Sequence, residues 1–97
     1  MHTLIAIIRA RKGHEELVRA ELLKVAAFVA AQERDTVSFY VAQSPDDPCV
    51  FTTYERFTNR AAMDRHNAGA ASTGFFAAAG DALDGDVTVV TAVEIAP

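Results

Sequence analysis

The most constraining feature of this sequence is a short segment near its start that is apolar on two opposite sides. Residues 2–10 alternate with the period of a β-strand, and both faces of that strand are largely apolar. One face carries Leu4, Ala6 and Ile8, and the other carries Ile5, Ile7 and Arg9. A strand of this kind lies in the middle of a sheet that is covered on both sides. The fold must therefore pack another layer against each of the two faces of this strand.

The rest of the chain alternates between helical and extended patterns, in the overall order β-α-β-β-α-β. This order predicts an α+β fold of the ferredoxin-like type, a four-stranded antiparallel sheet with its helices on one face. We expect a helix over residues 14–33, strands over 37–43 and 49–57, a helix over 60–68, a further helical segment over 73–83 and a strand over 86–95. Turn-forming residues separate these elements at Lys12-Gly13, Arg34-Asp35-Thr36, Ser44 to Pro48, Gly69 to Ser72 and Gly85.

The predicted helices supply the first cover through apolar stripes. These stripes consist of Val18, Leu22, Val25 and Val29 in the long helix and of Phe75, Ala79 and Leu83 in the last helical segment. The opposite face of the sheet needs another layer packed against it. A chain of 97 residues that is 51% hydrophobic has more apolar surface than its helices alone can bury. We therefore expect residues 1–97 to form a single domain that works as a homodimer, with the two sheets packed face to face.

Charge and cysteine content narrow the partners and the location. The net charge is −4 and the nine Lys and Arg residues are scattered, so no nucleic-acid interface is expected. No apolar stretch is long enough to span a bilayer, and Met1-His2-Thr3 lacks the basic start of a signal peptide. Cys49 is the single cysteine, which rules out an internal disulfide and favours a cytoplasmic location. Because the three histidines lack metal-ligand spacing and nucleotide-binding motifs are absent, we expect neither a metal nor a cofactor.

Two titratable residues are the candidates for catalysis. His66 falls on the same helical face as Asn59, Ala62 and Met63, a face that should look toward the sheet. An imidazole there can act as a base or hydrogen-bond a ligand oxygen near neutral pH, and the alternative is a buried histidine with only a packing role. Glu55 lies between apolar neighbours on one face of its strand, so it is either buried with a partner or placed at the rim of the sheet. The alternative to a role in the site is an ion pair or a backbone acceptor at the dimer contact.

Aromatic and sulfur-containing side chains are the candidates for substrate contacts. Tyr40 and Tyr54 offer hydroxyls that could orient a substrate, although strand tyrosines are commonly core rings with a wet tip. Five phenylalanines could wall an aromatic pocket, and their alternative role is plain core packing: Phe39, Phe51, Phe57, Phe75 and Phe76. Met63 is a further candidate for a substrate contact. The expected ligand is a small aromatic or hydrophobic molecule.

Taken together, these residues resemble the antibiotic biosynthesis monooxygenase family. The most specific part is the block Phe51 to His66, with the pattern Phe-x-x-Tyr-Glu-Arg-Phe-x-Asn-x-x-Ala-Met-x-x-His, and the likeness covers nearly the whole chain. The resemblance implies a dimeric α+β barrel with His66 in the pocket, Glu55 near the pocket or the dimer contact, and Tyr40 facing the neighbouring region. Members include cofactor-independent monooxygenases of anthrones and hydroquinones, along with haem-degrading and isomerase relatives.

The sequence departs from the family pattern at three places. Phe57 stands where many members have Trp, so any role that needs an indole N–H is lost. Arg34-Asp35-Thr36 replaces a turn of the Pro-Gly-Cys type. Ala6 stands where the haem-degrading relatives have Asn, which argues against haem degradation.

These features lead to one hypothesis and two alternatives. The hypothesis is cofactor-independent oxidation of a hydroquinone, anthrone or polyketide-like molecule by molecular oxygen, with His66 as the base and Tyr40 or Tyr54 orienting the oxygen atoms. One alternative is a non-catalytic module that binds a small molecule, and the other is a cofactor-free isomerase of a small carbonyl compound. One scaffold hosts many functions, so the fold by itself does not separate these three.

Overall fold

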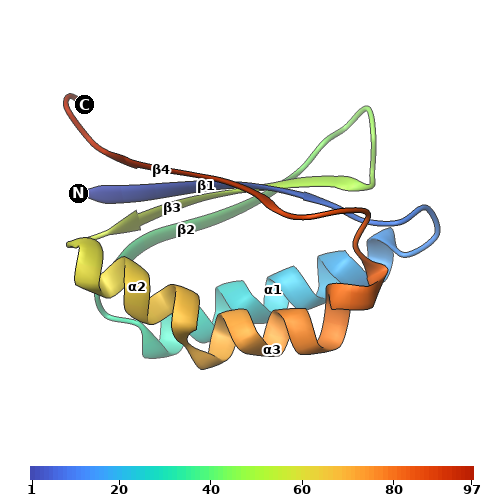
Figure 1. Ribbon diagram of the computed structural model, residues 1–97, viewed down its shortest axis with the longest axis horizontal. Coiled ribbons are helices and arrows are strands. Elements are labelled where there is room, and N and C mark those ends of the chain that lie inside the picture. Colours follow the sequence, from blue (N-terminus) through green and yellow to red (C-terminus); the bar gives the residue numbers. More distant parts are fainter.

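The four strands of the protein form one antiparallel sheet, which two helical segments and a long helix cover on one side (Figure 1). The computed structural model describes residues 1–97. Its elements are β1 (His2–Arg9), α1 (Glu15–Gln32), β2 (Thr36–Gln43), β3 (Val50–Phe57), α2 (Arg60–Ala68), α3 (Ala70–Ala79), a 3₁₀ turn (Gly80–Ala82) and β4 (Thr88–Val93). The strand order β2-β3-β1-β4 is that of a ferredoxin-like fold, so the predicted fold class is confirmed.

Strand β1 lies in the interior of the sheet, as its two apolar faces predict. It pairs with β3 on one side and with β4 on the other, and Leu4 has Glu55 and Thr91 as its partners. Strands β2 and β3 form the predicted hairpin, which holds Phe39 opposite Glu55. These pairings place Phe39, Glu55 and Leu4 side by side on the face of the sheet that the helices cover.

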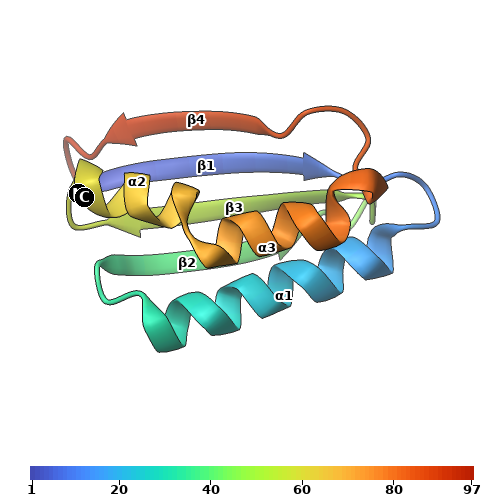
Figure 2. The same ribbon diagram turned by 60° about the horizontal axis from the view of Figure 1, so that its bottom comes forward.

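The helices bury the predicted apolar stripes against that face (Figures 1 and 2). In α1 the buried residues are Val18, Leu22, Val25 and Val29, and Phe75, Ala79 and Leu83 are buried in and after α3. The sheet contributes Leu4, Ala6, Ile8, Phe51 and Phe57 to the same core. None of the helices is both long enough and apolar enough to span a bilayer.

The break between the last two helices is narrower than the predicted stretch from Gly69 to Ser72. Only Gly69 leaves the helical conformation, and α3 begins at the next residue. A Cβ at position 69 would lie 2.8 Å from the carbonyl oxygen of Arg65, closer than real Cβ atoms come, so the sharp joint requires glycine. The strand boundaries and those of the long helix differ from the expected ones by at most two residues; for example, β2 begins at Thr36 and β4 spans Thr88–Val93.

The second face of the sheet carries a row of exposed apolar side chains that crosses all four strands. The register aligns Tyr40 of β2, Tyr54 of β3, Ile5 of β1 and Val90 of β4 in one line. All four side chains are at least 40% exposed. No part of the same chain packs against this apolar face, which is more extended than the surface of a monomeric protein usually is.

Two neighbouring leucines of α1 can test which face of this helix is buried in the core. Leu22 is 3% exposed and Leu23 is 51% exposed. We expect Leu22→Ala to lower the free energy of unfolding by about 2–5 kcal/mol, because it removes buried methyl groups and leaves a void. Leu23→Ala, with the same chemical change, should cost less than about 1 kcal/mol. Urea unfolding of both variants measures the difference, and equal losses would show that α1 buries a different stripe.

Candidate functional site

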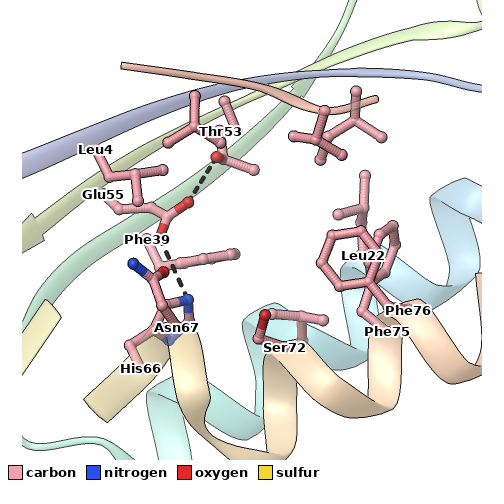
Figure 3. Close-up of a pocket in the computed structure, with 15 residues that line it drawn as sticks. Leu4, Leu22, Phe39, Thr53, Glu55, His66, Asn67, Ser72, Phe75 and Phe76 are labelled. Carbon is pink, nitrogen blue, oxygen red and sulfur yellow. Dashed lines mark hydrogen bonds and ion pairs between the residues drawn. The ribbon is translucent and has the colours of Figure 1, made fainter. Parts of the chain in front are cut away.

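A cavity of about 290 Å³ lies between the sheet and the helices. Its walls are mainly apolar, with Leu22 and Phe75 at one end. The polar lining residues Thr53, Glu55, His66, Asn67 and Ser72 come from β3, α2 and α3, and Figure 3 shows Glu55, His66 and Asn67 together at the opposite end. The volume is near the lower end of the range for small-molecule sites, and the apolar wall with one polar end is typical of them.

Glu55 places a carboxylate in this cavity because alternate residues of β3 face the helices. The residue is 4% exposed, and its Oε2 accepts a hydrogen bond of 2.7 Å from the hydroxyl of Thr53. Its Oε1 lies 3.3 Å from Nε2 of His66, within ion-pair range, but the two atoms do not meet the geometry of a hydrogen bond. One buried carboxylate oxygen therefore has acceptor capacity to spare at the polar end of the cavity.

His66 reaches the cavity because the N-cap of α2 fixes the face that this helix turns toward the sheet. The side chain of Asn59 accepts a hydrogen bond of 2.9 Å from the backbone N–H of Ala62, which starts the helix. Ala62, Met63 and His66 are the buried residues of α2, as their spacing predicted. The imidazole Nδ1 lies 2.7 Å from Oε1 of Glu33, so the geometry assigns an Nδ1–H that donates to this carboxylate.

The imidazole of His66 thus lies between two carboxylates. Burial by itself lowers the pKa of His66, but the close contacts with the negative charges of Glu55 and Glu33 outweigh burial and raise the pKa above its ordinary value. The phenyl rings of Phe39 and Phe57 flank the imidazole, with centroids 5.5 and 5.4 Å away. An imidazole held beside a carboxylate at one end of an apolar cavity can exchange a proton with a bound molecule.

The structure brings together only part of the residues that the sequence singled out. His66, Glu55 and Phe39 line the cavity. Phe57 and Met63 are buried beside it, Phe57 against the imidazole, but neither is a lining residue. Tyr40 and Tyr54 do not line it.

The two tyrosines are placed on the opposite face of the sheet. Tyr54 directly precedes Glu55 in β3, and successive side chains of a strand point to opposite faces. Tyr40 is the cross-strand partner of Tyr54, so it shares that outer face, and the two are 64% and 40% exposed. Within one chain neither hydroxyl reaches the cavity, so the expectation that they orient a substrate beside His66 does not fit a single subunit.

Sequence reasoning missed Glu33, Thr53, Asn67 and Ser72 as members of the site. A signal for Glu33 was present, because it follows Val29 by four residues and so continues the buried stripe of α1. Thr53 shares the face of Glu55 by strand alternation. No group of three or more His, Cys, Asp and Glu side chains is arranged to hold a metal ion.

The fold and the cavity define a ferredoxin-like α+β protein with a mainly apolar cavity between its sheet and its helices. The sequence profile described as antibiotic biosynthesis monooxygenase matches residues 1–78, and the chain belongs to this family. The resemblance found in the sequence is therefore confirmed. No curated protein matches the sequence.

Solved structures share the fold over almost their whole length. A protein of Nitrosomonas europaea that carries the family's name has a TM-score of 0.91 at 19% identity, covering 99% of this chain and 100% of that one. Rv0793 of Mycobacterium tuberculosis has a TM-score of 0.88 at 22% identity over 99% of this chain and 96% of its own. PA3566 of Pseudomonas aeruginosa has a TM-score of 0.85 at 27% identity over 98% and 94%.

The raised pKa of His66 gives the stability of the protein a specific pH dependence. A raised folded-state pKa means that the imidazolium stabilises the fold fully below the unfolded value of about 6.5, and that this contribution disappears as the pH rises through the folded value. We expect the stability advantage of wild type over His66→Gln to be largest below about pH 6.5 and to shrink toward alkaline pH. Urea unfolding of both proteins across this range measures it, and an advantage that grows with pH would contradict the assignment.

Proposed function

We propose that this protein is a monooxygenase that uses molecular oxygen, without a bound cofactor, to oxidise a small hydroquinone, anthrone or polyketide-like molecule. The observation that carries the proposal is the buried Glu55–His66 pair at the polar end of an apolar cavity. Membership of the antibiotic biosynthesis monooxygenase family supports oxygen chemistry as the reaction type.

The chemistry requires little more than this pair. Ground-state oxygen is a triplet, so its direct reaction with a closed-shell organic molecule is spin-forbidden. A phenol or anthrone that loses a proton becomes an electron-rich anion, which can give one electron to oxygen. The resulting organic radical and superoxide combine to form a C–O bond as a peroxide. The protonated peroxide then loses water and leaves a carbonyl group, so both oxygen atoms are accounted for.

The residues of the cavity have separate tasks in this proposal. The free Oε1 of Glu55 accepts the proton of the substrate, and the imidazole of His66 behind it shares that proton. Phe39, Phe75 and Phe76 line the cavity and enclose the aromatic part of the substrate. An apolar enclosure keeps water from the radical and peroxide intermediates.

The same pair also supports a second candidate function. Isomerisation of a small carbonyl compound needs a group that removes a proton at one carbon and returns it at another. Glu55 and His66 could perform that transfer in the absence of oxygen. A non-catalytic binding module would use the cavity without either reaction. Oxygen dependence separates the monooxygenase from both alternatives, and product formation under nitrogen identifies an isomerase.

The exposed row on the outer face of the sheet supports a homodimer. Tyr40, Tyr54, Ile5 and Val90 form a continuous apolar line across the four strands, and two sheets can pack face to face through such surfaces. Arg56 and Glu94 form an ion pair of 2.6 Å on the same side, which leaves these charges matched at the contact. Two copies packed through this face would provide the second cover that β1 requires and would form a dimeric α+β barrel.

Oxygen uptake with a panel of hydroquinones and anthrones tests the proposed reaction. We expect uptake by metal-stripped wild type, and a loss of about 10²–10⁴-fold in Glu55→Gln and in His66→Ala, because each variant removes part of the acid–base pair. Asp64→Asn is the matched control, since Asp64 lies on the exposed side of α2 and pairs only with Arg60, at 3.8 Å. Uptake that Glu55→Gln and His66→Ala leave unchanged would overturn the roles given to this pair.

Placing a charge in the exposed row tests the homodimer. Ile5 is 43% exposed on the sheet and Leu23 is 51% exposed on α1. We expect Ile5→Lys to shift the protein from dimer to monomer at micromolar concentration, because it would bury an unpaired ammonium in the contact. Leu23→Lys, the same kind of change on the helical side, should remain dimeric. Light scattering reports the masses, and a monomeric wild type would rule the dimer out.

A further inference from the structure

We propose that Glu33 is a positioning residue for this site and that it connects the imidazole of His66 to solvent on the side away from the cavity. The inference rests on the proposed function for its catalytic meaning, but its geometric part is independent of any substrate. In this proposal, protons move from the cavity to an outer cleft through the side chains of Glu55, His66 and Glu33.

The outer cleft lies between α2 and the end of α1. It is a polar hollow of about 540 Å³ whose lining includes Gln32, Glu33, Thr36 and Arg65. His66 is the one residue that lines both the inner cavity and this cleft. Its two ring nitrogens are directed accordingly, with Nε2 toward Glu55 inside and Nδ1 toward Glu33 outside.

Glu33 is held in place for this contact. Its Oε1 accepts a hydrogen bond of 2.8 Å from the hydroxyl of Thr36 and lies 2.7 Å from Nδ1 of His66. The side chains of Glu55 and His66 are each 6% exposed and that of Glu33 is 18% exposed, so the path leads from the interior toward water. The end of α1 and the start of β2 therefore supply an anchored carboxylate to a residue of α2.

Other charged groups surround the path but do not touch the imidazole. Asp35 and Arg65 pair with each other at 3.0 Å in the outer cleft. Arg34 also lines this cleft. Glu33 and Glu55 are the two carboxylates in direct contact with His66, from the α1–β2 connection and from β3.

The path moves one proton without any co-reactant. The O–H or C–H bond of the substrate breaks, and its proton goes to Oε1 of Glu55 and then to Nε2 of His66. The imidazole then releases its Nδ1 proton to Oε1 of Glu33, which passes it to water in the outer cleft. The reverse sequence returns a proton to the peroxide anion and restores the Nδ1–H form of the imidazole. A substrate that fills the cavity therefore does not block proton exchange with solvent.

Nitrogen-detected NMR of the histidine side chains in Glu33→Gln tests the proposal, whether or not a substrate has been found. We expect the pKa of His66 to fall, because a contacting negative charge is removed, and the Nδ1–H fraction of the neutral imidazole to decrease. Asp35→Asn is the matched control: it removes a carboxylate from the same cleft that does not contact His66. Its effect on both signals should be much smaller.

A second, milder variant keeps the test valid if Glu33→Gln does not fold. Thr36→Val removes the hydroxyl that holds Glu33, and it should shift both signals of His66 in the same direction by a smaller amount. Equal effects of Glu33→Gln and Asp35→Asn would overturn the proposal. They would indicate that His66 responds to the overall negative charge of the cleft and not to its contact with Glu33. If wild type consumes oxygen, the pH profile of uptake should also move to lower pH in Glu33→Gln. Absence of uptake with the expected NMR shifts would reject the monooxygenase and retain the path.

Discussion

Burying the carboxylate of Glu55 is the constraint on which the rest of this structure depends. Moving a charged group into a protein interior costs several kcal/mol unless partners compensate it. Strand alternation leaves Glu55 no choice of face, because Phe51, Thr53 and Phe57 must all point into the core. The compensation comes from the hydroxyl of Thr53 on the same strand and from His66 on α2. The position of α2 over the end of β3 is therefore fixed by charge as well as by apolar packing.

The cavity follows from the joint that separates α2 from α3. A single continuous helix would carry its buried face straight along the sheet and leave no reason for a void. The bend at Gly69 lets His66 on one segment and Phe75 on the other face the same space from opposite ends. This arrangement puts Glu55 and His66 at one end of the cavity and aromatic walls at the other. The position where only glycine fits is thus as much a part of the site as its lining residues.

The fold and half of the site could be predicted from the sequence, because the periodicity of helices and strands determines which side chains face the core. Val18, Leu22, Val25 and Val29 and the face of His66 are set by local spacing, which one helix determines by itself. The contact of His66 with Glu33 joins residues that are 33 positions apart, and it depends on where α1 ends relative to α2. No local pattern encodes that distance. Tyr40 and Tyr54 were grouped with the site by chemistry, although their alternation with Phe39 and Glu55 already placed them on the opposite face.

Strand β3 couples the two faces of the sheet. Thr53 and Glu55 point into the cavity, while Tyr54 and Arg56 point to the outer face, so the backbone that positions the carboxylate also carries the exposed row. A partner sheet packed on that row would restrict the twist and sliding of β3. Such restriction matters most for Glu55 because its Oε1 lies within ion-pair range of Nε2 without the alignment of a hydrogen bond. A small movement of the strand would therefore decide whether that oxygen contacts His66 or a ligand, so the proposed dimer would act directly on the Glu55–His66 pair.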